Sequence, residues 1–256
     1  MRDKKLKHKI IAIPFAGGNK FSFRNLEKYI PDDFEWVTLE LPGRGDRFNK
    51  PFLTTMKNVI DDLFDQLLPH IEDGVYMIYG HSLGTLLGYE LTKKLVTEGM
   101  PLPCCLYVTG RGAPSSKESE NWGALPLNLF WKKVHEIGGL PQEVLETTEF
   151  LEFYYPILRS DFELIESYEY KKLKTPLPIP IYVCLGSKEI GEEDHKASIG
   201  QIKAWNDETI HTVVPEFLEG DHFFILKRSK AMIQKICKAF EMSLHKKIIC
   251  LSRCFP

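Results

Sequence analysis

One short segment of the chain has the residue types and spacing of a nucleophile held on a tight turn. Gly80-His81-Ser82-Leu83-Gly84 follows an apolar run and precedes a stretch with helical periodicity. A sharp strand-to-helix turn lifts its central serine above the sheet edge, and the flanking glycines remove side chains that would clash with neighbouring backbone. The same letters could form a plain glycine-rich turn, but this context favours Ser82 as a nucleophile.

A serine hydroxyl needs a general base, usually a histidine that a carboxylate holds in place. Of the eight histidines in the chain, His222 is the best candidate. It lies in Gly220-Asp221-His222-Phe223-Phe224, a loop between the last expected strand and the last expected helix. His81 lies inside the serine turn and is expected to face away from the nucleophile. The alternative for His222 is an ordinary histidine in a surface loop.

The acid that orients the base is expected after the fifth strand, which ends near Gly186. Glu189 lies three residues past Gly186, and Asp194 lies five residues further along the chain. Either carboxylate could orient His222, whereas Asp221 is its sequence neighbour and is expected to point elsewhere. The residues alone leave Glu189 and Asp194 as alternatives.

An oxyanion that forms during acyl transfer needs two backbone N–H groups aimed at it. Leu83, directly after the serine, is expected to give one. The loop Phe15-Ala16-Gly17-Gly18 after the first strand is expected to give the other, from Ala16. A phosphate-binding loop is the alternative for Gly17-Gly18, but the rest of a Walker or dinucleotide signature is missing.

Strands and helices alternate along the chain, which predicts a mostly parallel sheet covered by helices on both faces. The expected strands are 9–14, 36–41, 75–79, 102–109, 179–185 and 209–214. The expected helices outside the insertion are 21–29, 55–71, 83–98 and 227–245. The roughly 65 residues between the fourth and fifth strands are too many for a plain crossover. We expect them to form a helical lid over the carboxyl edge of the sheet, where α/β proteins bind ligands. Extra packing helices are the alternative.

Composition excludes several other classes of protein. The 33 basic and 35 acidic residues leave a formal net charge of −2, whereas nucleic-acid binders usually carry a basic excess. No apolar run approaches the roughly 20 residues of a transmembrane helix. The basic N-terminus could begin a signal peptide, but Pro14 interrupts its apolar stretch. The six cysteines lack zinc-site spacing and are expected to be structural thiols. We expect a cytoplasmic monomer without bound metal.

Several motifs together resemble the type II thioesterases of nonribosomal peptide and polyketide synthesis, to which the mammalian medium-chain fatty-acid thioesterase is related. The resemblance covers roughly residues 9–240. Besides the serine turn and the His222 loop, the matching stretches are Ile13-Pro14-Phe15-Ala16-Gly17-Gly18, Leu41-Pro42-Gly43-Arg44-Gly45-Asp46-Arg47, Thr109-Gly110-Arg111-Gly112-Ala113-Pro114 and Pro156-Ile157-Leu158-Arg159-Ser160-Asp161-Phe162. The resemblance implies a single α/β-hydrolase domain over residues 1–256, with a helical lid at about 115–175.

The resemblance implies hydrolysis of acyl thioesters on the phosphopantetheine arm of a carrier protein, for editing or for acyl release. The nucleophile of the family falls on Ser82 and its base on His222. Its acid falls on Glu189 when counted from the strand and on Asp194 when counted back from the helix that holds Trp205. The strand register favours Glu189 and residue chemistry favours Asp194, with a slight preference for Glu189.

No resident cofactor is implied, because the phosphopantetheine belongs to the substrate. The expected partner is an acidic carrier-protein domain, met by a basic surface that could include Lys132, Lys133, Arg159, Lys171 and Lys172. Two other functions use the same sequence features. One is a carboxylesterase or acyltransferase acting on small esters, because a triad does not set the substrate. The other is an acyl-binding protein without catalysis.

Overall fold

A six-stranded sheet forms the centre of the molecule. The computed structural model describes residues 7–71, 74–116, 122, 124–138, 140, 146–191 and 196–254. The strands lie in the order β2-β1-β3-β4-β5-β6, and every neighbouring pair is parallel. Their bounds are β1 His8–Ile13, β2 Phe34–Thr38, β3 Tyr76–His81, β4 Leu106–Thr109, β5 Ile181–Gly186 and β6 Glu216–Leu218. The predicted parallel sheet is confirmed, and its strands all end at one edge.

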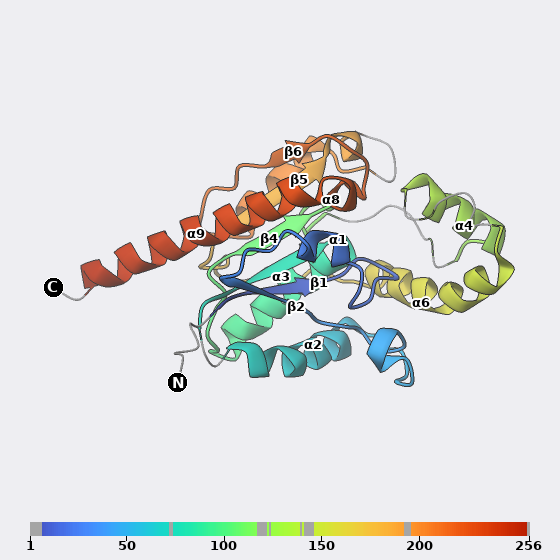
Figure 1. Cartoon of the computed structure of the whole chain (residues 1–256), viewed down its shortest axis with the longest axis horizontal. Helices are drawn as coiled ribbons and strands as arrows, with labels where there is room; N and C mark the ends of the chain where they lie inside the picture. Colours follow the sequence, from blue (N-terminus) through green and yellow to red (C-terminus); the bar gives the residue numbers. More distant parts are fainter. Residues whose placement is uncertain are drawn as a thin grey trace.

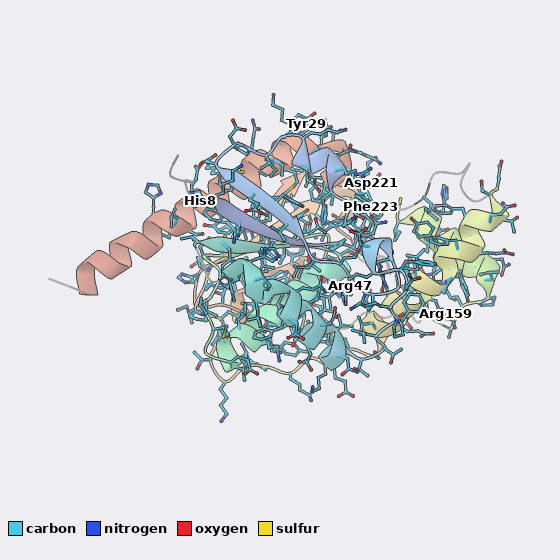
Figure 2. The ribbon with its side chains drawn as sticks, turned by 60° about the horizontal axis from the view of Figure 1, so that its bottom comes forward. His8, Tyr29, Arg47, Arg159, Asp221 and Phe223 are labelled. Atoms are coloured by element: carbon cyan, nitrogen blue, oxygen red, sulfur yellow. The ribbon has the colours of Figure 1, made fainter. Side chains whose placement is uncertain are left out.

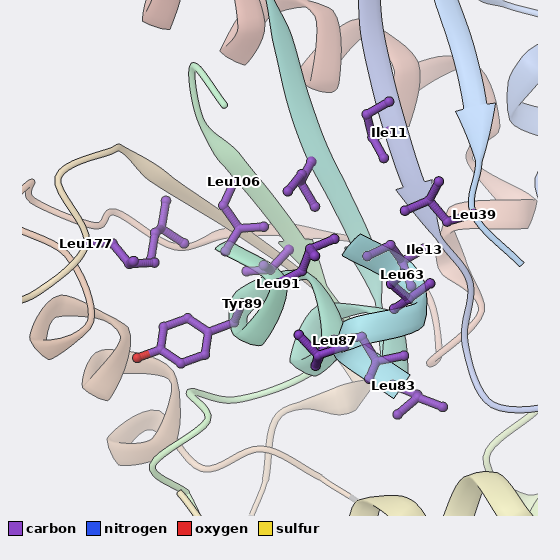
Figure 3. Close-up of a cluster of buried hydrophobic side chains, with 14 of the residues drawn as sticks. Ile11, Ile13, Leu39, Leu63, Leu83, Leu87, Tyr89, Leu91, Leu106 and Leu177 are labelled. Atoms are coloured by element: carbon purple, nitrogen blue, oxygen red, sulfur yellow. The ribbon is translucent and has the colours of Figure 1, made fainter. Parts of the chain in front are cut away.

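Helices cover both faces of this sheet (Figure 1). One face packs against α2 (Met56–Ile71) and α3 (Leu83–Thr97), and the other against α1 (Arg24–Glu27), α8 (Phe224–Lys227) and α9 (Ser229–Cys254). Successive side chains of a strand point to opposite faces. Ile11 and Ile13 of β1 therefore join the first cluster (Figure 3), whereas Ile10 and Ala12 join the second.

The chain between β4 and β5 carries two longer helices, α4 (Leu127–Glu136) and α6 (Thr148–Glu166), which extend beyond the carboxyl ends of the strands (Figure 1). This insertion has an apolar cluster of its own, formed by Trp122, Phe130, Trp131, Val134 and Leu158. Trp122 stacks on Phe162 of α6 with ring centroids 4.7 Å apart. The insertion is therefore a packed unit rather than a long loop.

The predicted sixth strand is wrong. Thr209 makes only an isolated bridge with Leu177, and the strand that extends the sheet is β6, a few residues later. Ile210 and Val214 suggested a buried strand, yet they are 62% and 75% exposed. β6 is an edge strand of only three residues, two of them exposed, and is too short to show an alternating pattern. The helix predicted for residues 21–29 is shorter in the structure, where it is α1.

Four short helical segments complete the described elements. They are η1 (Gly45–Arg47), η2 (Ser187–Glu189), α7 (Ile199–Lys203) and η3 (Ala204–Asp207). Over the described part of the chain, no helix combines the length and apolarity that crossing a membrane requires.

Candidate active site

Ser82 occupies a strained turn between β3 and α3. Its φ is 55° and its ψ is −115°, and no other described non-glycine residue has a positive φ. A Cβ atom on Gly80 would lie 2.2 Å from the Gly84 carbonyl oxygen, and one on Gly84 would lie 1.9 Å from the Ile13 carbonyl oxygen. Both glycines are thus required by close backbone contact. Strain of this kind persists where surrounding structure enforces it, typically at functional sites.

The structure brings His222 and Glu189 together. Nδ1 of His222 lies 2.6 Å from Oε1 of Glu189, and the side chain of Glu189 is only 7% exposed. The other carboxylate oxygen, Oε2, accepts a 2.6 Å hydrogen bond from the Gly186 N–H. With Nδ1 engaged by a carboxylate, Nε2 is the nitrogen left to exchange a proton with a substrate or a hydroxyl. The alternative acid, Asp194, lies outside the described residues.

Close backbone packing docks the His222 loop onto the end of β5. The Lys188 N–H donates to the Gly220 carbonyl over 2.9 Å. A Cβ on Gly186 would lie 2.6 Å from the Asp221 carbonyl oxygen, so glycine lets the two segments approach. The Asp221 carboxylate accepts from the Phe223 N–H and pairs with Lys227. The Asp221 carboxylate therefore turns away from the imidazole of His222, although Asp221 lies at the carboxyl edge of the sheet, beside Phe223 (Figure 2).

The loop after β1 forms a tight turn at the same edge. The Gly18 N–H donates to the Phe15 carbonyl over 2.8 Å, and Gly17 has a φ of 76°. Ala16 has a negative φ, so the turn has the pattern of type II. In a trans peptide, N–H and C=O point in opposite directions. Because the Phe15 C=O points at Gly18, the Ala16 N–H points away from the turn.

Two backbone N–H groups at this edge, those of Ala16 and Leu83, remain candidates for stabilising an anion. The Gly17 N–H donates to Asp161 and the Gly18 N–H to Phe15, which leaves the Ala16 N–H as the candidate donor of this loop. Leu83 is the first residue of α3, and the first N–H groups of a helix have no acceptor within the helix. They also lie at the positive end of the helix dipole.

Replacing Ala16 with proline tests this donor. Proline is favoured at the second position of a type II turn, so Ala16→Pro removes the N–H while keeping the turn. We expect kcat to fall by about 10² to 10³-fold, as for the loss of one oxyanion-hole donor elsewhere. Steady-state hydrolysis measures the effect, and Ala16→Gly, which keeps the N–H, is the control. Equal kcat values for the two variants would exclude the Ala16 N–H as an oxyanion donor.

A cavity of about 230 Å³ joins Ser82 and His222 to the insertion. Most of its wall is apolar or aromatic, and much of it comes from the insertion. The wall residues from the insertion are Val134, Ile137, Leu140, Phe150, Tyr154, Leu158 and Phe162. The sequence placed Leu158 and Phe162 in a matching motif but did not indicate that these side chains form a cavity wall. Helical periodicity would have grouped the members on α6, because residues 150, 154, 158 and 162 are four apart.

His81 lies buried beneath His222. It is fully buried, its ring centroid is 4.9 Å from that of His222, and its Nδ1 lies 2.9 Å from Thr109 Oγ1. Burial holds the pKa of His81 well below its usual value, and the neighbouring His222 imidazole lowers that pKa further. His81 is therefore neutral in the folded protein at neutral pH.

The lowered pKa of His81 predicts acid sensitivity of folding. Below about pH 6.5 the unfolded chain takes up a proton at His81 that the folded protein does not, so stability falls as pH falls. Relative to His81→Gln, the wild type should lose up to about 1.4 kcal/mol of unfolding free energy per pH unit in this range. Urea unfolding of both proteins at several pH values measures the difference. Parallel pH curves would mean that His81 protonates freely in the fold.

The parallel sheet, the strained serine turn after β3 and the helical insertion at the carboxyl edge define an α/β-hydrolase fold. A family model described as "Thioesterase domain" matches residues 8–240. The chain belongs to this thioesterase family.

Known relatives agree with this assignment. The gramicidin S biosynthesis protein GrsT of Aneurinibacillus migulanus is 29% identical over 94% of this chain and 92% of its own length. The probable anguibactin biosynthesis thioesterase AngT of Vibrio anguillarum is 30% identical over 88% of this chain and 89% of its own. The crystal structure of ClbQ from the colibactin NRPS/PKS pathway superposes with a TM-score of 0.84, at 25% identity over 93% of this chain and 98% of ClbQ.

Proposed function

We propose that the protein is a serine thioesterase that hydrolyses acyl groups from the phosphopantetheine arm of carrier proteins in a peptide or polyketide assembly line. The observation that carries this proposal is the 2.6 Å contact between His222 Nδ1 and Glu189 Oε1 at one wall of the cavity that Ser82 also lines. Membership of the thioesterase family supports a thioester substrate. The names of GrsT and AngT as biosynthesis proteins, and the NRPS/PKS pathway named for ClbQ, support a role in such an assembly line.

In the proposed reaction, Nε2 of His222 takes the proton of Ser82 as its oxygen attacks the thioester carbonyl. Glu189 holds the imidazole and stabilises its charged form. The N–H groups of Ala16 and Leu83 stabilise the tetrahedral oxyanion. The C–S bond breaks, and the pantetheine sulfur leaves with the proton from His222. Water, activated by His222, then releases the acid and regenerates Ser82. The protein supplies every group, and the phosphopantetheine belongs to the substrate.

The acyl chain is proposed to lie in the apolar cavity beneath the insertion, which acts as a lid over the carboxyl edge of the sheet. Burial of each methylene contributes about 0.8 kcal/mol, so this wall favours apolar acyl groups. Carrier-protein docking is proposed to use basic side chains of the insertion and the segment that follows it. Lys171 and Lys172 are exposed. Arg159, on α6 in Figure 2, forms an ion pair with Glu163, with 3.0 Å between Nε and Oε1. It therefore contributes less net positive charge to this surface.

A substrate comparison separates this proposal from the alternative, a carboxylesterase or acyltransferase for small esters. The same acyl group is presented as a thioester on a carrier protein, as a thioester on free pantetheine and as a simple oxygen ester. The proposal predicts the highest kcat/KM for the carrier-bound thioester. Similar values for the three substrates, or a preference for the oxygen ester, would favour the alternative. The comparisons with known proteins support the thioesterase and not this alternative.

A further inference from the structure

A buried ion pair links α6 of the insertion to the loop after β2, and its carboxylate also contacts the loop after β1. Arg44 and Asp161 are 4% and 2% exposed. Arg44 donates from both terminal nitrogens to Asp161, over 2.6 Å from Nη1 to Oδ2 and over 2.8 Å from Nη2 to Oδ1. Oδ2 of Asp161 also accepts from the Gly17 N–H over 2.7 Å. Three segments far apart in the sequence therefore meet at one carboxylate.

Stability alone does not account for this pair. Removing two charges from water is costly, and apolar side chains of similar volume often stabilise a protein as well or better. Some buried polar groups instead select one conformation among several, and the second partner of Asp161 indicates which conformation is selected here. That partner, Gly17, is adjacent to Ala16 in the loop proposed to stabilise the oxyanion.

The contact fixes the middle peptide of the turn. A β-turn with glycine at its third position can adopt type I or type II, and the two differ by a flip of the central peptide. The central peptide here joins Ala16 to Gly17, and its N–H is the one that Asp161 accepts. Nη1 of Arg44 also lies 3.5 Å from the Gly18 carbonyl oxygen. A flip would turn the Gly17 N–H away from Asp161 and release the loop after β1 from this anchor.

The same residue fixes one wall of the cavity. Leu158 and Phe162 line the cavity from α6, one turn before Asp161 and directly after it. A Cβ atom on Gly17 would lie 2.7 Å from Leu158 Cδ2, so α6 rests directly on the loop. Asp161 therefore fixes the position of the loop after β1 relative to the α6 wall of the cavity.

We propose that Asp161 is a positioning residue, which, with Arg44 as its counter-ion, anchors the loop after β1 through the Gly17 N–H and so keeps the adjacent Ala16 N–H in place for the oxyanion. This inference rests on the proposed function. It assigns no contact between Asp161 and the substrate. The acceptor oxygen, rather than the negative charge, is what the turn requires.

Two double variants isolate that acceptor. Arg44→Met with Asp161→Asn removes both charges and keeps a carbonyl oxygen near Gly17. Arg44→Met with Asp161→Leu removes the same charges and the acceptor, and leucine keeps the branching of the asparagine side chain, although it is larger. Each is assayed for kcat, KM and Tm on an acyl-loaded carrier protein, with active sites counted by a fluorophosphonate probe.

The expected result is a kcat about 10² to 10³-fold lower for the leucine variant than for the asparagine variant, the size of a lost oxyanion donor. KM and Tm should stay close, because the acyl pocket and the charge balance are shared. Equal kcat values in the two variants would overturn the inference. If the leucine variant does not fold, the asparagine variant decides, since a loss of 10²-fold or more despite its acceptor would overturn it. An inactive wild type would contradict the proposed function instead.

Discussion

Ser82→Ala should abolish acyl hydrolysis while leaving the protein folded. Removing the serine of such a triad lowers kcat by about 10⁶-fold in a well-studied hydrolase, with residual activity from transition-state binding alone. The loss here should be of that order, because no other hydroxyl is held on the strained turn. Alanine is smaller than serine and keeps the backbone N–H that donates to the Thr109 carbonyl over 2.9 Å. The fold should therefore be retained.

The measurement is a progress curve on an acyl thioester, together with labelling by a fluorophosphonate and peptide mapping. Wild type should be labelled at Ser82, and the alanine variant should not be labelled. Ser167→Ala, which changes an exposed serine at the end of α6, is the matched control and should keep wild-type turnover. Full activity of Ser82→Ala would show that hydrolysis uses another nucleophile.

Glu189→Gln should lower kcat by about 10⁴-fold, as the corresponding carboxylate-to-amide change does in a serine protease. The amide keeps the shape of the carboxylate but not its charge. It therefore no longer stabilises the protonated imidazole, and it allows the wrong tautomer of His222. Because Glu189 also accepts from the Gly186 N–H, glutamine can keep this contact through its carbonyl oxygen. The loss should therefore appear in kcat more than in Tm.

Two neighbouring carboxylates serve as controls for that variant. Asp221→Asn changes the residue next to His222, whose carboxylate pairs with Lys227 instead of the imidazole. Asp194→Asn changes the other acid that the sequence left open. Both should keep activity within a few-fold of wild type. A sharp loss in Asp194→Asn with an active Glu189→Gln would assign the acid to residue 194. Full activity of Glu189→Gln and of Asp194→Asn would exclude Glu189 and Asp194 as the acid.

Local patterns in the sequence predicted the sheet and the serine turn. Apolar runs that alternate with helical segments predicted the parallel strands. Gly80 and Gly84 mark positions where one backbone segment closely approaches another. β6 was missed because a strand of three residues is too short to show an alternating pattern, while the apolar Ile210 nearby faces solvent. Whether such a residue joins a strand, and whether its side chain is buried, depends on neighbours that are distant in the sequence.

Long-range contacts explain what else the sequence left open. Counting residues could not choose between Glu189 and Asp194, because the choice depends on how the His222 loop docks on β5. The Lys188 contact with Gly220 sets that docking in the structure. The ion pair of Arg44 and Asp161 joins residues 117 positions apart. Both residues lay in motifs that matched the family, yet neither motif indicated their pairing.

The central claim is that Ser82 removes acyl groups from a carrier protein. Its most direct test is intact-mass spectrometry of an acyl-loaded carrier protein after incubation with wild type and with Ser82→Ala. We expect loss of the acyl mass with wild type only, leaving the free phosphopantetheine thiol on the carrier. Loss with both proteins would contradict the role of Ser82. An unchanged carrier mass with wild type, across a panel of acyl groups, would contradict the thioesterase function itself.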